Sequence, residues 1–260
     1  MYDWPEIRDP TDALWRAVRD AAARRGLDLP GELDRARLPF DLWTDPALVL
    51  GQTCGLPFVT RLRGKVRLLA TPCYSATGCE GPRYSSMIVV ARNSGYRQLA
   101  DLRGARAAYN GPHSQSGYAA LRATLAPLAD GQPFFAKTIE TGSHRASLRA
   151  LAEDLADICA VDALCWALAT RHDTAITCRL RVIGQTAMTP GLPLICAISR
   201  NDSEVAAIRE ALAEAIAEGL DPATRTALML DGLEILPEHD YDAISAMGDA
   251  ADALDYKILH

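Results

Sequence analysis

Residues 105–118, with the sequence ARAAYNGPHSQSGY, contain the pattern that decides the fold. The short, mostly apolar segment 105–109 predicts a strand. A loop rich in Gly and Pro follows it and leads into a helix predicted from about Ser116 to Leu128. The same order of strand, polar loop and helix recurs along the chain without an internal repeat. It predicts an α/β architecture with mainly parallel sheets.

The remaining elements follow from apolar periodicity. Further strands are predicted at 47–51, 66–70, 87–91, 135–140, 158–161, 179–183 and 194–198. Further helices are predicted at 12–23, 144–154, 163–170 and 205–216, the last with Ser203 as its N-cap. Ligands of such folds bind beyond the carboxyl ends of strands, so the polar loops at those ends are the candidate sites.

The richest of these loops is 110–118, where Ser114, Gln115, Ser116 and Gly117 enter a predicted helix. A helix N-terminus has unpaired N–H groups and a partial positive charge, which favour an anion. Serine hydroxyls can donate to the same anion. The alternative is that Ser116 only caps the helix. The loop contains no P-loop lysine and no G-x-S-x-G elbow, so it does not match those two motifs.

Other strand ends also carry polar side chains. His144 lies in the first turn of a predicted helix, where it is either a surface residue or a cationic partner of an anion. Asp162 ends an apolar strand and either caps the next helix or accepts a ligand proton. Thr53 follows another strand, and Tyr84 differs because it precedes its strand.

Composition and charge exclude several classes of protein. A chain of 260 residues with 49% hydrophobic and 23% charged residues is globular and can form one or two domains. Residues 201–260 hold 3 of the 27 basic and 14 of the 33 acidic residues, a local charge of -11 against +5 for the rest. Without a domain-wide basic surplus, nucleic acid is not an expected partner. The acidic tail is predicted to form outer helices.

The seven cysteines contain no CxxC pair, and no HExxH motif is present, so no metal or cofactor is expected. Cys73 and Cys79 flank a loop and are either a disulfide in an oxidising compartment or two reduced thiols.

Three segments resemble a known family. Residues 101–104 with 109–118 resemble the "DL-GK…S-SGY" segment of substrate-binding proteins of phosphate- and phosphonate-type ABC transporters. Residues 141–144 with 156–162 resemble their "SGSH…ADVAA-D" segment, and Gly191–Pro193 resembles the return crossover. The resemblance extends from about Leu48 to Arg200.

The resemblance implies a two-lobed type II periplasmic-binding-protein fold, with mixed sheets flanked by helices and two crossover strands between the lobes. We place lobe one at residues 1–89 and 190–260 and the inserted lobe two at 90–189. By this resemblance, the ligand-binding residues are Ser114, Gln115, Ser116, Gly117, His144, Tyr84, Thr53 and Asp162.

The implied function is to close, by a hinge motion, on a small oxyanion such as a phosphonate for an ABC-type uptake system. No catalytic residue is then expected. The alternatives are a cytosolic enzyme on the same fold, with His144 and Asp162 as acid–base partners, and a ligand sensor. The sequence motifs reveal no nucleophile–base pair, which counts against the enzyme.

The implied partners are the oxyanion and an ABC transporter permease, and the protein is expected to be a monomer. The longest apolar runs fall short of the ~20 residues that a spanning helix needs, so no membrane insertion is expected. Residues 1–5 do not have the pattern of a signal peptide. The resemblance implies a periplasmic location, whereas the missing signal pattern leaves two alternatives, a cytoplasmic chain or one that is already processed.

Overall fold

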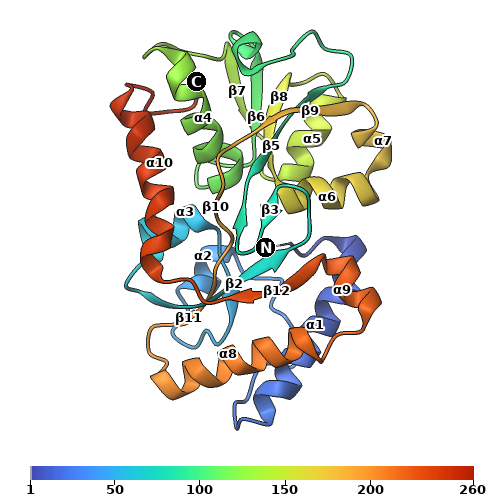
Figure 1. Cartoon of the computed structure of the whole chain (residues 1–260), viewed down its shortest axis with the longest axis vertical. Coiled ribbons are helices and arrows are strands. Elements are labelled where there is room, and N and C mark those ends of the chain that lie inside the picture. The colour runs from blue at the N-terminus through green and yellow to red at the C-terminus, as the bar shows by residue number, and fades with distance from the viewer. Residues whose placement is uncertain (1) are drawn as a thin grey trace. The chain divides into compact units, whose positions relative to one another are not determined.

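The computed structural model describes residues 2–260, which form two compact units, each built around its own sheet (Figure 1). Unit 1 consists of residues up to Ser75, Glu80–Pro82 and Pro190–Asp240. Unit 2 consists of Ala76–Cys79, Arg83–Thr189 and Tyr241–His260. The chain therefore passes between the units around residues 75–83, at 189–190 and again at 240–241.

These boundaries differ from the predicted division into 1–89 plus 190–260 and 90–189. Residues 83–89 belong to unit 2 because most of them form β5, a strand inside the sheet of that unit. The segment 241–260 also belongs to unit 2, because its helix packs on α4 and its apolar side chains complete the same core.

The sheet of unit 1 has four strands in the order β1-β11-β2-β12. These strands are β1 (Gly51–Gln52), β11 (Leu194–Ala197), β2 (Val66–Tyr74) and β12 (Leu230–Glu234). All neighbouring pairs are antiparallel, so the prediction of mainly parallel sheets is wrong for this unit. The strand β11, which follows unit 2 in the chain, lies between β1 and β2 and runs antiparallel to both.

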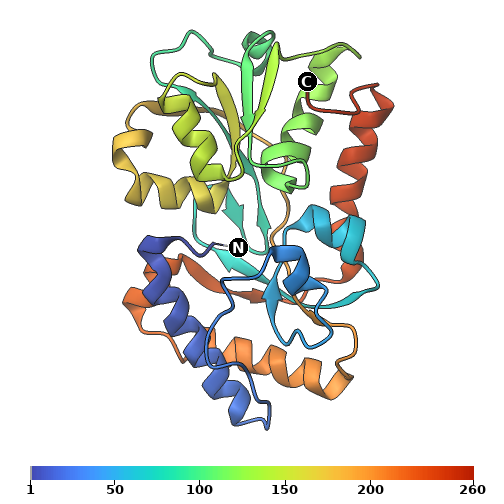
Figure 2. The same cartoon turned by 180° about the vertical axis from the view of Figure 1, so that it is seen from behind.

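Two helices of unit 1, α1 (Arg8–Ala23) and α8 (Asp202–Ala217), lie side by side in Figure 2 and share one core. Val18 and Ala22 of α1 are packed in that core with Ile208 and Leu212 of α8. The N-cap of α8 is Asn201, which accepts from Glu204 N, instead of the predicted Ser203. Unit 1 also contains η1 (Pro5–Ile7), α2 (Pro39–Trp43), α3 (Gly55–Pro57), the π-helix η2 (Phe58–Leu62) and α9 (Pro222–Leu228).

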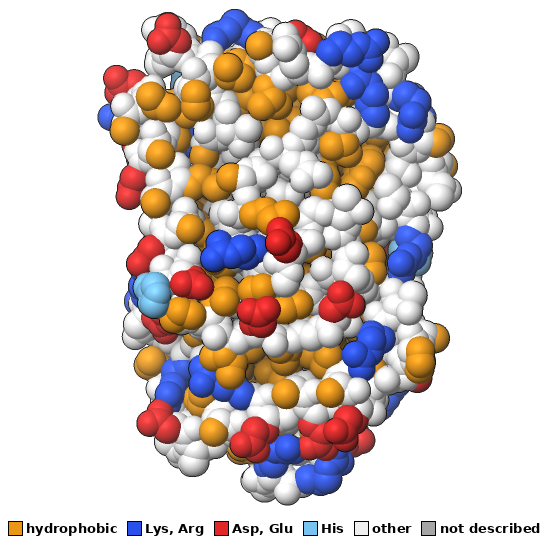
Figure 3. Space-filling view, viewed as in Figure 1, with side chains coloured by type: hydrophobic (Ala, Val, Ile, Leu, Met, Phe, Trp, Pro, Cys, Tyr) orange, Lys and Arg blue, Asp and Glu red, His pale blue; other side chains and the backbone are white. Residues whose placement is uncertain are grey.

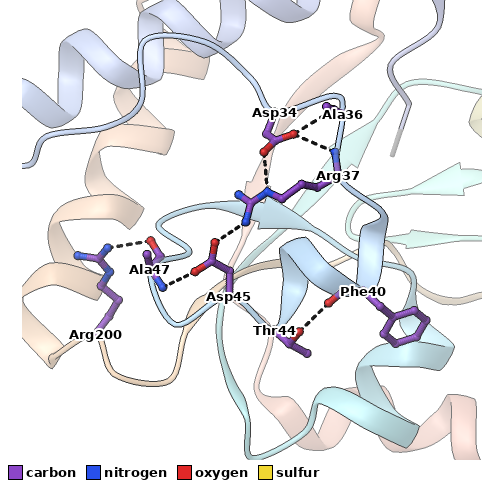
Figure 4. Close-up of polar contacts among 8 residues, drawn as sticks. All are labelled: Asp34, Ala36, Arg37, Phe40, Thr44, Asp45, Ala47 and Arg200. Atoms are coloured by element: carbon purple, nitrogen blue, oxygen red, sulfur yellow. Dashed lines mark hydrogen bonds and ion pairs between the residues drawn. The ribbon is translucent and has the colours of Figure 1, made fainter.

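Arg37 organises the long loop between α1 and β1 (Figure 4). Its guanidinium bonds to Asp34 at 2.7 Å and to Asp45 at 2.5 Å, and Asp45 accepts from Ala47 N. The pKa values of both carboxyls are lowered, chiefly by the hydrogen bond from Arg37. Arg200 adds a hydrogen bond to the carbonyl of Ala47. This loop is thus ordered by charged groups at the surface.

The sheet of unit 2 has five strands in the order β7-β6-β8-β5-β9. They are β7 (Lys137–Glu140), β6 (Arg106–Tyr109), β8 (Ile158–Asp162), β5 (Ser86–Ala91) and β9 (Leu180–Gln185). β6 runs parallel to both β7 and β8, whereas β5 runs antiparallel to β8 and β9. The sheet is therefore mixed, as predicted.

Helices cover both faces of this sheet, with α4 and α10 on one side and α5, α6 and α7 on the other (Figure 1). The helices are α4 (Ala120–Ala129), α5 (His144–Ala152), α6 (Ala163–His172), α7 (Thr174–Thr177) and α10 (Asp242–Ala253), with the short η3 (Leu99–Leu102) and the π-helix η4 (Gln115–Ala119). Ile88 and Val90 of β5 share a core with Leu121 and Leu125 of α4, while Val89 between them is fully buried as well. Burial on both faces explains the continuous apolar run of β5.

The acidic tail divides between the units. Asp242, Asp249, Asp252 and Asp255 lie on or just after α10 and are exposed, and Figure 3 shows acidic side chains along that edge. The prediction that the whole tail forms outer helices of lobe one is therefore wrong for α10, which belongs to unit 2.

Short strands form a third sheet, in the order β10-β4-β3, in the segments where the chain passes between the units. They are β10 (Thr189–Pro190), β4 (Arg83–Tyr84) and β3 (Cys79–Glu80), and η5 (Glu238–Tyr241) lies at the last passage. None of the seven cysteines forms a disulfide in the described residues 2–260, so Cys73 and Cys79 are two thiols. Over the same residues, no helix has both the length and the apolar character needed to cross a membrane.

Candidate functional site

The loop after β6 enters α4 through the π-helical turn η4, which begins at the N-cap Ser114. Ala119 N donates to Ser114 O at 3.1 Å, and Ala120 N donates to Gln115 O, a spacing of five residues. Single π-turns of this kind occur frequently at functional sites. The N-cap residue is Ser114, whose Oγ accepts from Gly117 N at 3.0 Å. Ser116, the predicted cap, therefore does not cap this helix.

Ser116 meets His144 although 28 residues separate them in the sequence. Ser116 Oγ lies 2.8 Å from His144 Nε2 and 3.5 Å from Ser114 Oγ. The two loops meet because β6 and β7 are parallel neighbours, so their carboxyl ends lie at one edge of the sheet. His144 starts α5, and Ser143 caps that helix by accepting from Ala146 N at 3.1 Å.

Gly117 allows Asn110 and His144 to approach the turn. A Cβ placed on Gly117 would lie 2.0 Å from Asn110 Oδ1, a distance that real Cβ atoms do not show, and 3.1 Å from His144 Cε1, which would require the histidine to shift slightly. Asn110 Oδ1 is shielded from solvent and has no hydrogen-bond partner within residues 2–260. A side chain at position 117 would therefore require Asn110 or the turn to move.

The imidazole of His144 is neutral at pH 7. Burial lowers the pKa of His144 from 6.5 to about 4, and the backbone carbonyl of Ala160 opposes this shift only in part. No charged side chain contributes to the shift among the described residues. The ring therefore acts as a hydrogen-bonding group and carries no charge of its own before a ligand arrives.

A pH titration of stability tests this environment. Because folding lowers the pKa of His144, the folded state binds fewer protons than the unfolded state between pH 4 and 6.5. The stability that the neutral ring contributes is complete above pH 6.5 and is lost as the pH falls toward 4. We expect wild type to lose about 2 kcal/mol more than His144→Gln over this range. Chemical denaturation at a series of pH values measures the difference, and parallel curves for the two proteins would contradict it.

Two other predicted site residues have structural contacts of their own. Gln115 is buried, and its Nε2 donates to Met247 Sδ of α10 at 3.6 Å. Asp162 caps α6, with Oδ1 accepting from Leu164 N at 2.8 Å and from Cys165 N at 3.2 Å. The capping alternative for Asp162 is thus present in the structure, and ligand contacts of both residues stay predictions.

The last two predicted residues are also buried. Tyr84 lies on β4 in unit 2 and is 5% exposed. Thr53 belongs to unit 1, where its N–H donates to Pro193 O at 3.0 Å and its Oγ1 donates to Cys54 O at 3.3 Å. Their places in a ligand site stay predictions.

Sequence reasoning missed Asn110 as a site residue and missed the support of η4 by the segment Tyr241–His260. Asn110 lies in the loop 110–118 at a strand end, so its position could have identified it as a site residue. The contacts of the C-terminal segment could not be predicted, because a helical pattern does not identify the partner of the helix.

Arg122 makes most of these C-terminal contacts. The residue is 8% exposed, and its guanidinium forms an ion pair with Asp252 and donates to Tyr256 O at 2.7 Å and Gly248 O at 3.0 Å. The hydroxyl of Tyr118 accepts from Leu259 N at 3.2 Å. Arg122 of α4 and Tyr118 of η4 therefore both hydrogen-bond to the C-terminal segment 241–260.

No group of three or more His, Cys, Asp and Glu side chains suited to a metal occurs in residues 2–260. The site does contain a hydroxyl beside an imidazole, a pair that the sequence motifs did not reveal. Its hydroxyls and helix N-terminus are suited to hydrogen-bonding an oxyanion.

The two units, each with a sheet covered by helices, have the fold of type II periplasmic binding proteins. Three solved structures show this similarity. PhnD1 from Prochlorococcus marinus in complex with methylphosphonate has a TM-score of 0.72 and 14% identity, covering 96% of this chain and 95% of the other. A binding protein component of an ABC phosphonate transporter from Pseudomonas aeruginosa has a TM-score of 0.70 and 16% identity, covering 94% and 83%. XAC2383 from Xanthomonas citri bound to ATP has a TM-score of 0.69 and 17% identity, covering 96% and 94%.

The family model for the periplasmic phosphonate substrate-binding protein of ABC transporters matches residues 50–241, about three quarters of the chain. The chain belongs to this family. No curated protein sequence matches it. The family assignment and the fold confirm the resemblance that the sequence motifs indicated.

Proposed function

We propose that the chain binds a small organophosphorus oxyanion, with a phosphonate as its substrate, at the π-turn η4 that leads into α4. The observation that carries this proposal is the convergence of Ser114, Ser116 and His144 on this turn within hydrogen-bonding distance. The first N–H groups of a helix lack intrahelical acceptors, and they supply donors to an anion without net positive charge. The turn therefore holds the anion through backbone and hydroxyl groups.

The family supports the choice of ligand, since its members are the periplasmic binding components of phosphonate transporters. We propose that this chain likewise acts in the periplasm, as a monomer, and delivers its ligand to an ABC permease. One solved relative holds methylphosphonate, which makes that compound the first ligand to test.

Calorimetric titration with methylphosphonate tests the site. We expect the double variant Ser116→Ala/His144→Ala to bind at least about 100-fold more weakly, because it removes two of the groups on the anion. Ser94→Ala is the matched control, since its hydroxyl donates to Ala91 O and accepts from Arg181 at the opposite end of β5. Wild-type affinity in the double variant, with its thermal unfolding unchanged, would overturn the assignment.

One observation favours the alternative of an enzyme. The 2.8 Å contact between Ser116 Oγ and His144 Nε2 is the geometry of a nucleophile with its base. Catalytic pairs of this kind also need a group that orients the base, and no carboxylate bonds to His144 Nδ1 within residues 2–260. We therefore propose binding without turnover. Mass spectrometry of methylphosphonate and its methyl ester after incubation checks this, and a new product that requires Ser116 would support the enzyme.

A further inference from the structure

The turn η4 and the start of α4 have one face that contacts the C-terminal segment 241–260. Three side chains form this face, and they follow one another at intervals of three and four residues, the spacing of helical neighbours. They are Gln115, Tyr118 and Arg122. Each of them is joined to the segment by a hydrogen bond. Ser116 does not belong to this face, and its Oγ lies 2.8 Å from His144 Nε2. The turn therefore connects the C-terminal segment with the proposed anion site.

The C-terminal segment is also held in unit 2 by contacts that do not involve this face. Ala251, Tyr256 and Leu259 belong to the core of the unit. Phe134 N donates to His260 O at 2.7 Å, and the hydroxyl of Tyr256 donates to the same carbonyl at 2.7 Å. The segment, with α10, is therefore a stable support against which the turn can be positioned.

Gln115 provides the contact that lies closest in the sequence to the anion groups. It is the first residue of η4, and its two neighbours in the sequence, Ser114 and Ser116, have hydroxyls 3.5 Å apart. The side chain of Gln115 is buried, and its Nε2 lies 3.6 Å from Met247 Sδ of α10. Any shift of this contact moves the backbone that joins the two serines. The contact therefore helps to set where their hydroxyls lie.

We propose that Gln115 and Met247 are positioning residues, through which α10 holds the hydroxyls of Ser114 and Ser116 in the arrangement that binds the anion. This inference rests on the proposed function, because it places the anion at the same turn. Gln115 then acts without touching the ligand, in contrast to the ligand contact that the sequence resemblance implies for it. Residues that orient metal ligands have the same kind of role, and their replacement typically lowers metal affinity by about 10- to 100-fold.

A double-mutant cycle on methylphosphonate affinity tests the proposal. Gln115→Leu and Met247→Leu each replace one partner of the contact with an apolar side chain. We expect each variant to bind methylphosphonate about 10-fold more weakly in calorimetric titration, because a small displacement loosens a preorganised site. The double variant should bind no more weakly than the weaker single variant, since both changes break the same contact and two apolar partners can pack together. Gln132→Leu, the same exchange at an exposed glutamine beyond the far end of α4, should keep the wild-type affinity.

Hydrogen exchange gives a second readout that a merely structural role would not change. Coupling between the anion and α10 is reciprocal, so methylphosphonate should slow the exchange of the α10 amides in wild type. This protection should exceed that of α6, which lies on the other face of the sheet. In Met247→Leu saturated with methylphosphonate, α10 should be protected no more than α6.

The two measurements separate this proposal from the proposed function. A weakened Gln115→Leu beside a Met247→Leu of wild-type affinity would overturn the proposal and make Gln115 a direct ligand contact. Additive losses in the double variant, two unchanged affinities, or no extra protection of α10 in wild type would overturn it as well. In each of these cases the proposed function stands. Failure of wild type to bind methylphosphonate would instead overturn the proposed function.

Discussion

Replacing Gly117 with alanine is expected to abolish tight binding of methylphosphonate and to destabilise unit 2. The added Cβ would lie 2.0 Å from Asn110 Oδ1 and 3.0 Å from Asn110 Cγ, so the turn or the asparagine must move. Overpacking of this kind costs about 1–3 kcal/mol. A misplacement of about 1 Å costs about 100-fold in rate at catalytic sites, and we expect a loss of affinity of the same order when the anion donors are displaced. Calorimetric titration and chemical denaturation measure the two effects.

Gly111→Ala is the matched control in the same loop. Its new Cβ would come no closer than 3.7 Å to any neighbour, which is Glu140 Oε1, so stability should change by less than about 0.5 kcal/mol. Asn110→Ala combined with Gly117→Ala removes the main clash and should restore most of the stability lost. If Gly117→Ala alone binds methylphosphonate as tightly as wild type, the anion does not depend on this turn.

Replacing Arg122 with alanine is also expected to have a large effect, a loss of about 3 kcal/mol in the free energy of unfolding. The substitution leaves the carbonyls of Tyr256 and Gly248 without their donor and Asp252 without its ion pair. Buried groups that lose their partner are costly, whereas exposed ion pairs contribute little. Asp252→Asn should therefore cost less than about 1 kcal/mol, because the Asp252 side chain is 52% exposed and both carbonyl contacts remain.

Hydrogen exchange locates the effect of the Arg122 change. The amides of α10 and α4 should exchange faster in Arg122→Ala, because Arg122 on α4 bonds to Gly248 and Asp252 of α10. Arg67→Ala is a suitable control, since it also removes an ion pair and a carbonyl contact but its partner Asp202 is 95% exposed. An unchanged exchange rate in α10 would show that the other contacts of the C-terminal segment are sufficient.

The sequence predicted the strands and helices of unit 2 well because they alternate in regular order. β6, the helix beginning near Ser116 and β8 all occur where the periodicity places them. The mistakes concern long-range partners. Residues 83–89 and α10 were placed with lobe one, since an apolar strand and an amphipathic helix pack equally well on either sheet. The antiparallel pairing of β2 with β11 also depends on a connection through the other unit.

The candidate site was partly predictable for the same reason. Ser114, Ser116, Gly117 and His144 lie in loops at strand ends, and the rule for α/β sheets identifies such loops. Arg122 gave no signal, because an arginine on a helix is usually solvated. The π-turn was also invisible, and it moves the cap from Ser116 to Ser114. Freed from capping, the hydroxyl of Ser116 can bond to His144.

The passage of the chain at 240–241 has a consequence for the order of folding during synthesis. Every residue of unit 1 precedes this point, whereas Ala251, Tyr256 and Leu259 belong to the core around α4 in unit 2. Domains fold as units while the chain is made. Unit 1 therefore has its whole sequence first, although unit 2 contains the middle of the chain. The turn that bears Ser116 gains its contacts with the segment 241–260 only when that segment has been translated.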